Sequence, residues 1–302
     1  MNGKDRKTLR NGGEDRKMII VQMSGGLGNQ MFEYALYLKL RSMGKEVRMD
    51  DATCYGPGQR TKQLDVFGVS YDAATPEQLC RMTDSSMDPL SRVRRKLTGR
   101  RDLSYREAGC DYDPLVFQKD PALLQGCFQS ERYFSDIRDR VREAYRFRNL
   151  RPEGRILEYR DKIRERKGSS VAVHLRRGDY LDPKFSALYQ GICTDGWYEE
   201  AIRLMRQRVP DAAFFFFSND PRWVKEHYRG AGYVTVDGGT EDAGYEDLYL
   251  MSLCSHQIIA NSSFSWWGAW LNDNPDKTVI APKRWINGRS CRDIYTKEMT
   301  LL

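Results

Sequence analysis

The sequence predicts an α/β protein of two domains, and three observations support this fold class. In the second half, apolar runs of strand length alternate with segments of helical periodicity. A strand, a glycine-rich loop, a helix and a second strand follow one another between residues 18 and 51. The chain has 302 residues, which is more than one domain usually holds. We therefore expect domains over residues 18–150 and 151–302, preceded by a charged flexible tail over residues 1–17.

The first region is organised around the sequence SGGLGNQ. The apolar run MIIVQM at residues 18–23 predicts a strand before it, and residues 29–43 carry apolar side chains nearly all round a helix, which indicates a buried helix. Gly44 fits a helix C-terminus, and KEVRMDD at residues 45–51 predicts a second strand. Between residues 54 and 150, short helical patterns lie among Pro, Gly and charged clusters, and the sequence leaves their order open.

Five strand-like runs mark the second region. After a charged helix expected over residues 157–167, they read VAVHL, AFFFFS, YVTVD, QIIAN and TVIAP. Asp195 is the expected N-cap of the first helix between them, and Pro210 is its terminator. Further helical patterns lie at residues 221–229, 245–256 and 264–272. This alternation predicts a parallel, doubly wound sheet, a class that binds ligands at the carboxyl ends of its strands.

Composition excludes several classes of protein. No apolar run approaches the roughly 20 residues that span a bilayer, and the first 17 residues lack the apolar core of a signal peptide. The seven cysteines have no CxxC spacing, which is typical of free thiols in a reducing compartment. With only three histidines, the chain gives little basis for a metal site. We therefore expect a cytoplasmic protein without a metal.

The charge balance favours an acidic partner. The chain carries 49 Lys and Arg against 42 Asp and Glu, a formal net charge of +7. Its densest basic run, SRVRRKLTGRR at residues 91–101, has no interleaved aromatic residues and no accompanying nucleic-acid signature, so we expect no nucleic-acid partner. A solvated basic face and peripheral contact with the anionic inner face of a membrane stay open as alternatives for this run.

Polar residues gather where the predicted strands of the second region end. HLRRGDY at residues 174–180, SNDP at 218–221 and NSSFSWW at 261–267 follow three of them. Arginine offers a planar fork of donors for phosphate oxygens, while a Ser-rich turn entering a helix offers hydroxyls, backbone N–H groups and the positive end of the helix dipole. Both features favour a diphosphate.

The two adjacent arginines are expected to differ in role. Successive side chains point to opposite sides of an extended chain. We therefore expect Arg176 to face the ligand and Arg177 to pair with Asp179 or another acidic residue.

Four motifs together resemble those of the α-1,2-fucosyltransferases of glycosyltransferase family 11, in its bacterial form. They are HLRRGDY, SND at residues 218–220, NSSFSWWGAW at 261–270 and GGLGNQ at 25–30, and they stand in the family's order. The resemblance implies a GT-B-like fold of two facing Rossmann-like domains, with the donor site in the C-terminal domain and the acceptor side in the N-terminal one. It also implies GDP-fucose as donor, inversion at the fucose anomeric carbon, and no required metal or other cofactor.

The resemblance also assigns roles to residues. Arg176 would hold the donor phosphate, His174 would lie near the nucleotide, and Asp247, fifteen positions before Ser262, would read guanine. Asp179 is the candidate general base and Asp182 a weaker one. The remaining expected donor-binding residues are Asn219, Asp220, Ser262, Ser263, Phe264 and Ser265. The glycine turn would bring Gly26, Gly28, Asn29 and Gln30 to an interdomain cleft.

Structural roles stay open for several of these residues. His174 fits an interior histidine, Asp247 a first-turn residue that stabilises its helix, and Asp220 a helix cap. The serines at residues 262, 263 and 265 are good capping residues in any protein, and the nearby tryptophans are expected in the core.

The preferred function is transfer of L-fucose from GDP-fucose to the 2-hydroxyl of a terminal galactose in a glycan. Another fucosyl linkage from the same donor is an alternative. A nicotinamide-dependent dehydrogenase is a further one, because GGLGNQ is a degraded dinucleotide fingerprint with Asp50 or Asp51 at about the distance of a ribose-binding acid. That alternative leaves the Arg and Ser motifs of the second half unexplained. A non-catalytic carbohydrate- or nucleotide-binding module is the last alternative.

Overall fold

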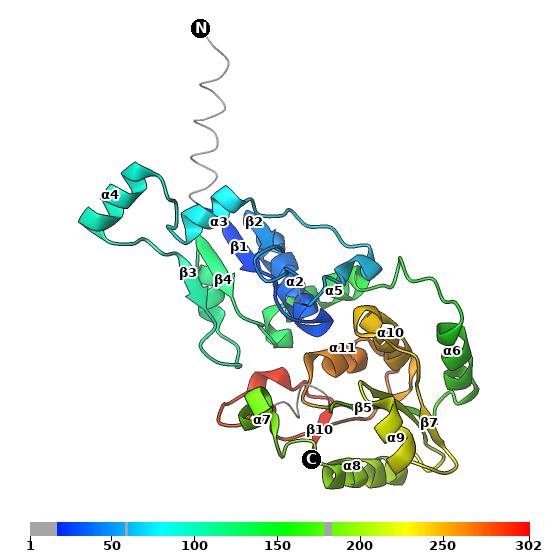
Figure 1. Cartoon of the computed structure of the whole chain (residues 1–302). Coiled ribbons are helices and arrows are strands. Elements are labelled where there is room, and N and C mark those ends of the chain that lie inside the picture. Colours follow the sequence, from blue (N-terminus) through cyan, green and yellow to red (C-terminus); the bar gives the residue numbers. More distant parts are fainter. Residues whose placement is uncertain (1–16, 58–59, 178–182) are drawn as a thin grey trace. The chain divides into compact units, whose positions relative to one another are not determined.

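The computed structural model describes residues 17–57, 60–177 and 183–302 (Figure 1). The first 16 residues of the expected tail, and the base candidates Asp179 and Asp182, lie outside the described residues. The chain divides into two compact units, residues 1–62 with 69–144 and residues 63–68 with 145–302. Each unit holds one parallel sheet with helices. The expected α/β class with two domains is confirmed, whereas the expected facing arrangement of the domains stays a prediction.

The first unit is built on a four-stranded sheet with the order β2-β1-β4-β3. Every neighbouring pair is parallel. The strands are β1 (Ile19–Gln22), β2 (Val47–Asp50), β3 (Ser104–Arg106) and β4 (Ala122–Gln125), and the α-helices are α2 (Leu27–Ser42), α3 (Pro76–Met82), α4 (Pro89–Thr98) and α5 (Arg138–Ala144). The predicted strand, helix and second strand near the start are thus present with slightly shifted ends.

Helix α2 is the buried helix that the apolar pattern predicts. Nearly all of its residues are buried, including the one carboxylate in its interior, Glu33. Lys39 and Arg41 lie in the last turn, where their positive charges stabilise the negative end of the helix dipole. Gly44 follows the C-cap with a φ of 76°, a left-handed conformation that favours glycine.

The second unit is built on a six-stranded parallel sheet with the order β10-β9-β8-β5-β6-β7. The strands are β5 (Ser170–Leu175), β6 (Ala213–Ser218), β7 (Tyr233–Thr235), β8 (His256–Ile258), β9 (Val279–Ala281) and β10 (Met299–Leu301). The helices are α6 (Arg155–Glu165), α7 (Pro183–Tyr189), α8 (Asp195–Arg208), α9 (Pro221–His227), α10 (Gly244–Leu253) and α11 (Ser263–Leu271). All five predicted strands are present, and β10 is an additional one.

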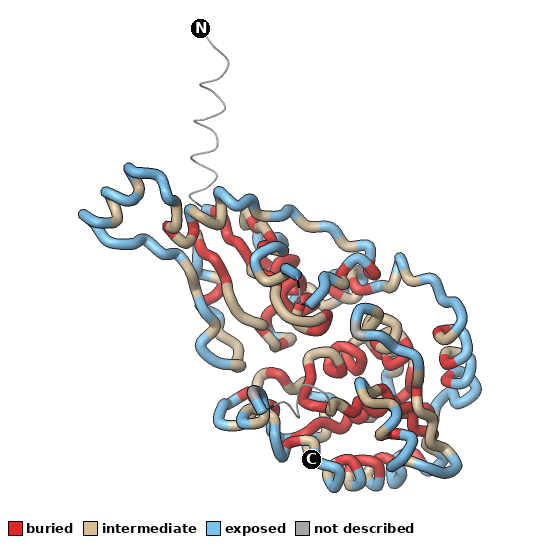
Figure 2. Tube along the Cα trace, viewed as in Figure 1, coloured by how far each residue is buried: buried red, intermediate tan, exposed pale blue. Residues whose placement is uncertain are grey.

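The central strands are buried on both faces, which explains their continuous apolar sequences (Figure 2). In β6, Phe214 and Phe216 pack with α8 and α9 on one face. Phe215 and Phe217 pack with α6 and α10 on the other. The expected N-cap of α8 was wrong by one position, because the hydroxyl of Thr194 accepts the bond from the backbone N–H of Trp197. Asp195 is instead the first helical residue.

Across the described parts of the chain, none of the helices combines the length and the apolar character needed to cross a bilayer.

Candidate functional site

The strand order of the second unit creates a switch point between β5 and β8. From β5 the chain continues through β6 to β7 on one side, and it then returns to β8, β9 and β10 on the other. Connections that leave two adjacent strands in opposite directions open a crevice at the carboxyl ends, where α/β proteins bind ligands. HLRR ends β5 and NSSFS follows β8, so the two expected phosphate-binding motifs flank this crevice.

Arg176 and Arg177 directly follow β5, and both are half-buried. Arg177 contributes to the surrounding structure. Its guanidinium carbon lies 3.7 Å from the centroid of the Trp223 ring. Its nitrogens lie 3.8 Å from carboxylate oxygens of Asp195 and Asp220. A stacked arginine with two acidic neighbours is held in place. The acidic partners of Arg177 among the described residues are therefore Asp195 and Asp220.

Asn219 and Asp220 both contact Arg177. The side-chain oxygen of Asn219 accepts a hydrogen bond from the backbone N–H of Arg177 at 3.0 Å. Asp220 is the N-cap of α9, and its carboxylate accepts from the backbone N–H of Trp223 at 3.1 Å. Asn219 and Asp220, both expected to bind the donor, thus make contacts within the protein. Asp220 has the capping role that the sequence left open.

The NSSFS motif forms the start of α11. Ser262 is the N-cap residue, but its hydroxyl accepts no bond from the first turn of the helix. The Ser265 hydroxyl is buried and donates to the carbonyls of Ala260 and Ser262, both at 3.3 Å. The first turn of α11 therefore presents backbone N–H groups and the positive end of its dipole at the crevice. The tryptophans that follow, Trp266, Trp267 and Trp270, are core residues as expected.

His174 and Phe264 connect the two strand ends. Their ring centroids lie 5.5 Å apart, and the rings are tilted by 47°. His174 is buried, and its backbone carbonyl accepts a bond from the Tyr198 hydroxyl at 3.0 Å. Phe264 is only half-buried, and it lies close to Gly244, where an added Cβ would stand 3.6 Å from its ring.

Asp247 lies in the first turn of α10 and contacts Arg155 of α6. The guanidinium donates to the carboxylates of both Asp247 and Glu246, the latter at 2.7 Å, and to the backbone carbonyl of Asp237. Burial raises the pKa of the Asp247 carboxyl, and Arg155 opposes that shift. Only one carboxylate oxygen of Asp247 takes part in this contact, which leaves the other as an acceptor.

In the first unit, the loops after β1 and β4 begin side by side. The two strands are neighbours in the sheet, and the chain passes through β2 and β3 between them. SGGLGNQ follows β1, and residues 126–129 follow β4. Asn29 joins these two loops, because its amide donates to the Cys127 sulfur at 3.4 Å and accepts from Gln129 at 2.9 Å.

The glycine turn after β1 is held by backbone geometry and by Gln30. Gly25 has a φ of 69°, and a Cβ there would come within 2.7 Å of the Asn29 amide. The buried side chain of Gln30 donates to the carbonyls of Gly25 at 3.1 Å and Thr61 at 2.9 Å. Gly26 is the N-cap of α2, and Gly28 is buried within that helix.

Two carboxylates that the sequence analysis did not single out stabilise these loops. Both oxygens of Glu33 accept from Ser24, one from its N–H and one from its hydroxyl, at 2.8 Å each. Burial raises the pKa of Glu33 well above its ordinary value. Glu107 accepts from the N–H groups of Cys127 at 2.9 Å and Phe128 at 3.1 Å, and burial raises its pKa too. The signal for Glu33 was present in the sequence, because a lone acidic residue in an apolar helix requires a partner.

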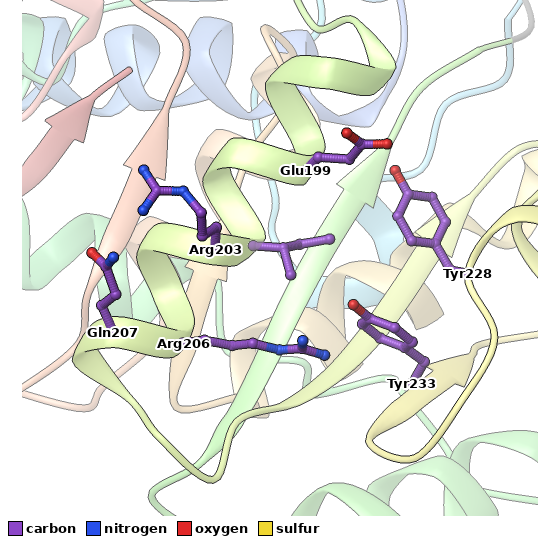
Figure 3. Close-up of a pocket in the computed structure, with 7 residues that line it drawn as sticks. Glu199, Arg203, Arg206, Gln207, Tyr228 and Tyr233 are labelled. Carbon is purple, nitrogen blue, oxygen red and sulfur yellow. The ribbon is translucent and has the colours of Figure 1, made fainter.

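A pocket of about 470 Å³ lies elsewhere in the second unit (Figure 3). Tyr228 and Tyr233 face the side chains of α8 across it. Tyr233 begins β7, so the pocket lies towards the amino-terminal ends of the strands rather than at the crevice. Separately, the described residues contain no group of three or more His, Cys, Asp or Glu side chains that could hold a metal ion.

Comparisons with known proteins identify relatives of the whole chain. It is 30% identical over 282 residues to the alpha-1,2-colitosyltransferase of Escherichia coli, covering 89% of this chain and 92% of that protein. It is 28% identical to the O-antigen biosynthesis glycosyltransferase WbnK of Escherichia coli, with coverage of 89% and 95%. To galactoside alpha-(1,2)-fucosyltransferase 1 of Homo sapiens it is 27% identical, over 83% of this chain and 64% of that protein.

Solved structures show weaker likeness. NodZ alpha-1,6-fucosyltransferase soaked with GDP-fucose is 13% identical, with a TM-score of 0.42 over 85% of this chain and 92% of that one. A variant of Arabidopsis thaliana FUT1 in complex with GDP is 13% identical, with a TM-score of 0.45 over 92% and 74%. Family membership rests on sequence instead. A family model described as Glycosyl transferase family 11 matches residues 116–301. The chain therefore belongs to glycosyl transferase family 11, and the resemblance to α-1,2-fucosyltransferases that its four motifs carry is confirmed.

Proposed function

We propose that the protein transfers L-fucose from GDP-fucose to the 2-hydroxyl of a terminal galactose in a glycan, with inversion at the fucose anomeric carbon. The observation that carries this proposal is the convergence of Arg176 and the first turn of α11 at the β5–β8 switch point. A cation and a helix N-terminus at one crevice suit the diphosphate of a nucleotide sugar. Family membership supports glycosyl transfer over the dehydrogenase alternative.

The donor diphosphate lies between Arg176 and residues 262–265 in this proposal. When the glycosidic bond breaks, negative charge grows on the β-phosphate. A fixed cation and oriented N–H groups stabilise that charge more than they stabilise bound GDP-fucose, so they accelerate the reaction. Arg177 keeps the loop after β5 in place through Trp223, Asp195 and Asp220. This division of roles requires no metal ion.

The guanine base is recognised by Asp247 in this proposal. Its second carboxylate oxygen accepts from guanine N1–H and the exocyclic amino group, a pattern that adenine does not offer. Arg155 is then a positioning residue, because its ion pair fixes the orientation of the carboxylate and opposes the rise in pKa that burial causes. Phe264 and His174 contribute a partly exposed aromatic edge near the nucleotide.

The galactose acceptor belongs to the first unit in this proposal. The loops joined by Asn29 present neutral amides and backbone groups, which suit the hydroxyls of a sugar better than a phosphate. Asp179, which follows the Arg pair by two positions, is the proposed base for the attacking 2-hydroxyl.

A donor and acceptor panel tests the proposal. The protein is incubated with GDP-fucose, GDP-colitose, GDP-mannose and UDP-galactose, each with galactose-terminated and glucose-terminated acceptors. We include GDP-colitose because a relative is named as a colitosyltransferase. Linkage and anomeric configuration are then determined by NMR. We expect an α-1,2-fucosyl galactoside, with activity retained in EDTA.

The outcomes separate the parts of the proposal. Transfer of colitose alone would correct the donor sugar, and a different linkage would correct the acceptor hydroxyl. Loss of activity in EDTA that magnesium or manganese restores would show that a metal is required. A folded protein that produces no fucosylated product with any galactoside would contradict the proposal as a whole.

A further inference from the structure

Helix α4 exposes its apolar residues to solvent. Among the large apolar side chains of the described residues, the four most exposed lie on or just before this helix. They are Leu90 at 83% exposed, Leu97 at 78%, Met87 at 77% and Val93 at 57%. Leu90, Val93 and Leu97 are three and four positions apart, so they share one face of the helix. An amphipathic helix usually turns such a face to the core, whereas α4 has no buried residue at all.

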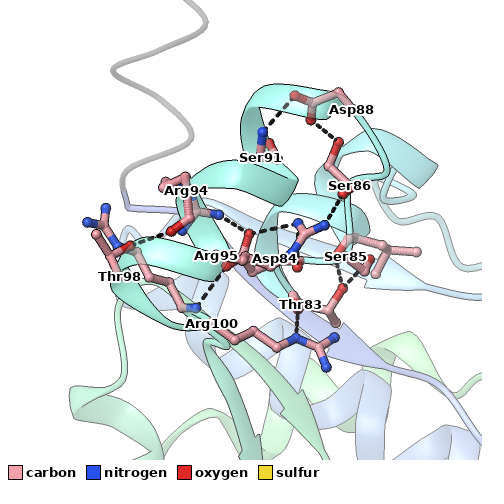
Figure 4. Close-up of polar contacts among 12 residues, drawn as sticks. Thr83, Asp84, Ser85, Ser86, Asp88, Ser91, Arg94, Arg95, Thr98 and Arg100 are labelled. Carbon is pink, nitrogen blue, oxygen red and sulfur yellow. Dashed lines mark hydrogen bonds and ion pairs between the residues drawn. The ribbon is translucent and has the colours of Figure 1, made fainter.

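Polar contacts hold α4 in this orientation (Figure 4). Arg94 pairs with the buried carboxylate of Asp84, and Arg95 donates to the backbone carbonyls of Asp84 at 3.1 Å and Ser86 at 2.6 Å. Asp88 caps the helix by accepting from the N–H of Ser91 at 2.8 Å. These contacts involve polar side chains and leave the apolar face uncovered. The apolar residues of α4 are therefore exposed although polar contacts hold the helix in place.

Cationic side chains accompany the apolar face. Residues 91–101 include six Arg and Lys and no Asp or Glu. Arg94 and Arg95 are bound to Asp84. Arg92 and Lys96 are exposed, and neither takes part in any ion pair recorded within the described part of the chain. These two residues are one turn apart, on the polar side of the helix.

We propose that α4 docks the protein on an anionic lipid bilayer, with Leu90, Val93 and Leu97 inserted among the headgroups. Exposed leucines next to cationic side chains are the features by which amphipathic helices bind the surface of such a membrane. A second copy of the chain is a poorer occupant, because it would bring the same cationic segment against this one. The proposal does not depend on the sugar donor or acceptor.

Vesicle co-sedimentation of the full chain tests the proposal. We expect binding to vesicles of phosphatidylcholine with phosphatidylglycerol, weak binding to phosphatidylcholine alone, and release by salt. The variant Leu90→Ser/Val93→Ser/Leu97→Ser should weaken binding at least about tenfold, because it removes the inserted face. Arg92→Gln/Lys96→Gln should weaken it about twenty-five-fold at low salt, because each of the two charges contributes about fivefold near an anionic surface.

The control is Leu115→Ser, which changes a leucine that is 49% exposed elsewhere in the same unit and should bind like the wild type. Because α4 buries no residue, the variants on this helix should keep the wild-type melting temperature. Equal binding by the triple variant and the wild type, or equal affinity for neutral and anionic vesicles, would overturn the proposal. So would a concentration-dependent dimer in light scattering that the triple variant abolishes, since the face would then bind a second copy.

Discussion

The two sheets of this protein are both parallel, and their edges differ in chemistry. The edges compared follow the neighbouring strands β1 and β4 in the first unit and β5 and β8 in the second. The β5–β8 edge presents Arg176 and the start of α11. The β1–β4 edge presents amides, and it is held by the buried carboxylate of Glu33 and the half-buried one of Glu107, whose pKa values are both raised. The comparison teaches that neighbouring parallel strands bring their following loops together in both units, while the residues in those loops decide which ligand suits them.

The two edges also differ in how far their polar groups bind one another. At the β1–β4 edge, the last residues of the four strands form a hydrogen-bonded row. Gln22 donates to Asp50 at 3.0 Å, Gln125 donates to Gln22 at 3.1 Å, and Arg106 donates to Gln125 at 3.2 Å. At the β5–β8 edge, the Ser262 hydroxyl does not cap its own helix. The strand-end side chains of the first edge thus bind one another, and the second edge is the one proposed above to bind the nucleotide.

The largest effect is expected from Arg176, the arginine proposed to bind the donor. Arg176→Ala should lower kcat by about a hundredfold to a thousandfold, because it removes one preorganised charge from the transition state. Arg176→Lys keeps the charge without the forked geometry and should recover only part of the loss. Steady-state kinetics with GDP-fucose measures both.

Arg177→Ala is the matched control for this prediction. It removes an arginine bound to Trp223 and two carboxylates, so it should cost stability more than turnover. A larger fall in kcat for Arg177→Ala than for Arg176→Ala would reverse the two roles.

Nucleotide selectivity should depend on Asp247. A hydrogen bond to a charged group is worth about 1.5–3 kcal/mol, so Asp247→Asn should weaken GDP binding by at least about tenfold. The preference of thermal protection for GDP over ADP and UDP should shrink in the variant. Glu246→Gln is the control, because it changes the other carboxylate on Arg155 and should leave that preference intact. Equal protection of the wild type by all three nucleotides would show that Asp247 does not recognise guanine.

A third prediction concerns the β1–β4 edge. Gly25→Ala forces a side chain into a left-handed conformation against Asn29, which should cost about 1–3 kcal/mol of stability. The KM for the galactoside should rise, while the Kd for GDP stays at the wild-type value. Gly196→Ala, at an open helical position with nothing near the added Cβ, is the control. If the affinity for GDP changed as much as the KM for the acceptor, the claim that the two edges bind different ligands would be contradicted.

The smallest effect is a pH dependence of stability that comes from Glu33. Its pKa is raised in the folded protein, so the folded state binds a proton at a pH where the unfolded chain has released it. The free energy of unfolding should therefore fall as pH rises from about 4.5, the ordinary pKa of Glu, to the raised pKa. Glu33→Gln should flatten this slope in urea titrations at pH 5–8. Parallel curves for variant and wild type would show that Glu33 does not cause the slope.

Continuous apolar runs made the second sheet predictable. VAVHL and AFFFFS are strands buried on both faces, and buried parallel strands have this pattern. Strands β3 and β10 read SYR and MTL and have no fully buried residue, so they lack the continuous apolar run that marks the strands predicted in the second sheet. Thr194 and Asp195 are both good N-caps, and only the backbone conformation decides between them.

The candidate site was predictable where a motif is local. HLRR and NSSFS each lie at one strand end, so the sheet topology was enough to bring them together. The contact between Arg155 and Asp247 joins residues 92 positions apart, and no local pattern reveals it. The contacts of Arg177 with Trp223 and two acids likewise depend on how separate elements pack.

Hydrogen exchange with bound GDP tests the central claim, that the β5–β8 edge binds the nucleotide and the β1–β4 edge does not. The wild-type chain is labelled with and without saturating GDP, with ADP as the control nucleotide, and exchange is read by mass spectrometry of peptides. We predict that GDP slows exchange in peptides covering residues 174–177 and 261–265 and leaves residues 24–30 and 126–129 unchanged. Protection of the glycine turn at residues 24–30, with none at residues 261–265, would contradict the claim.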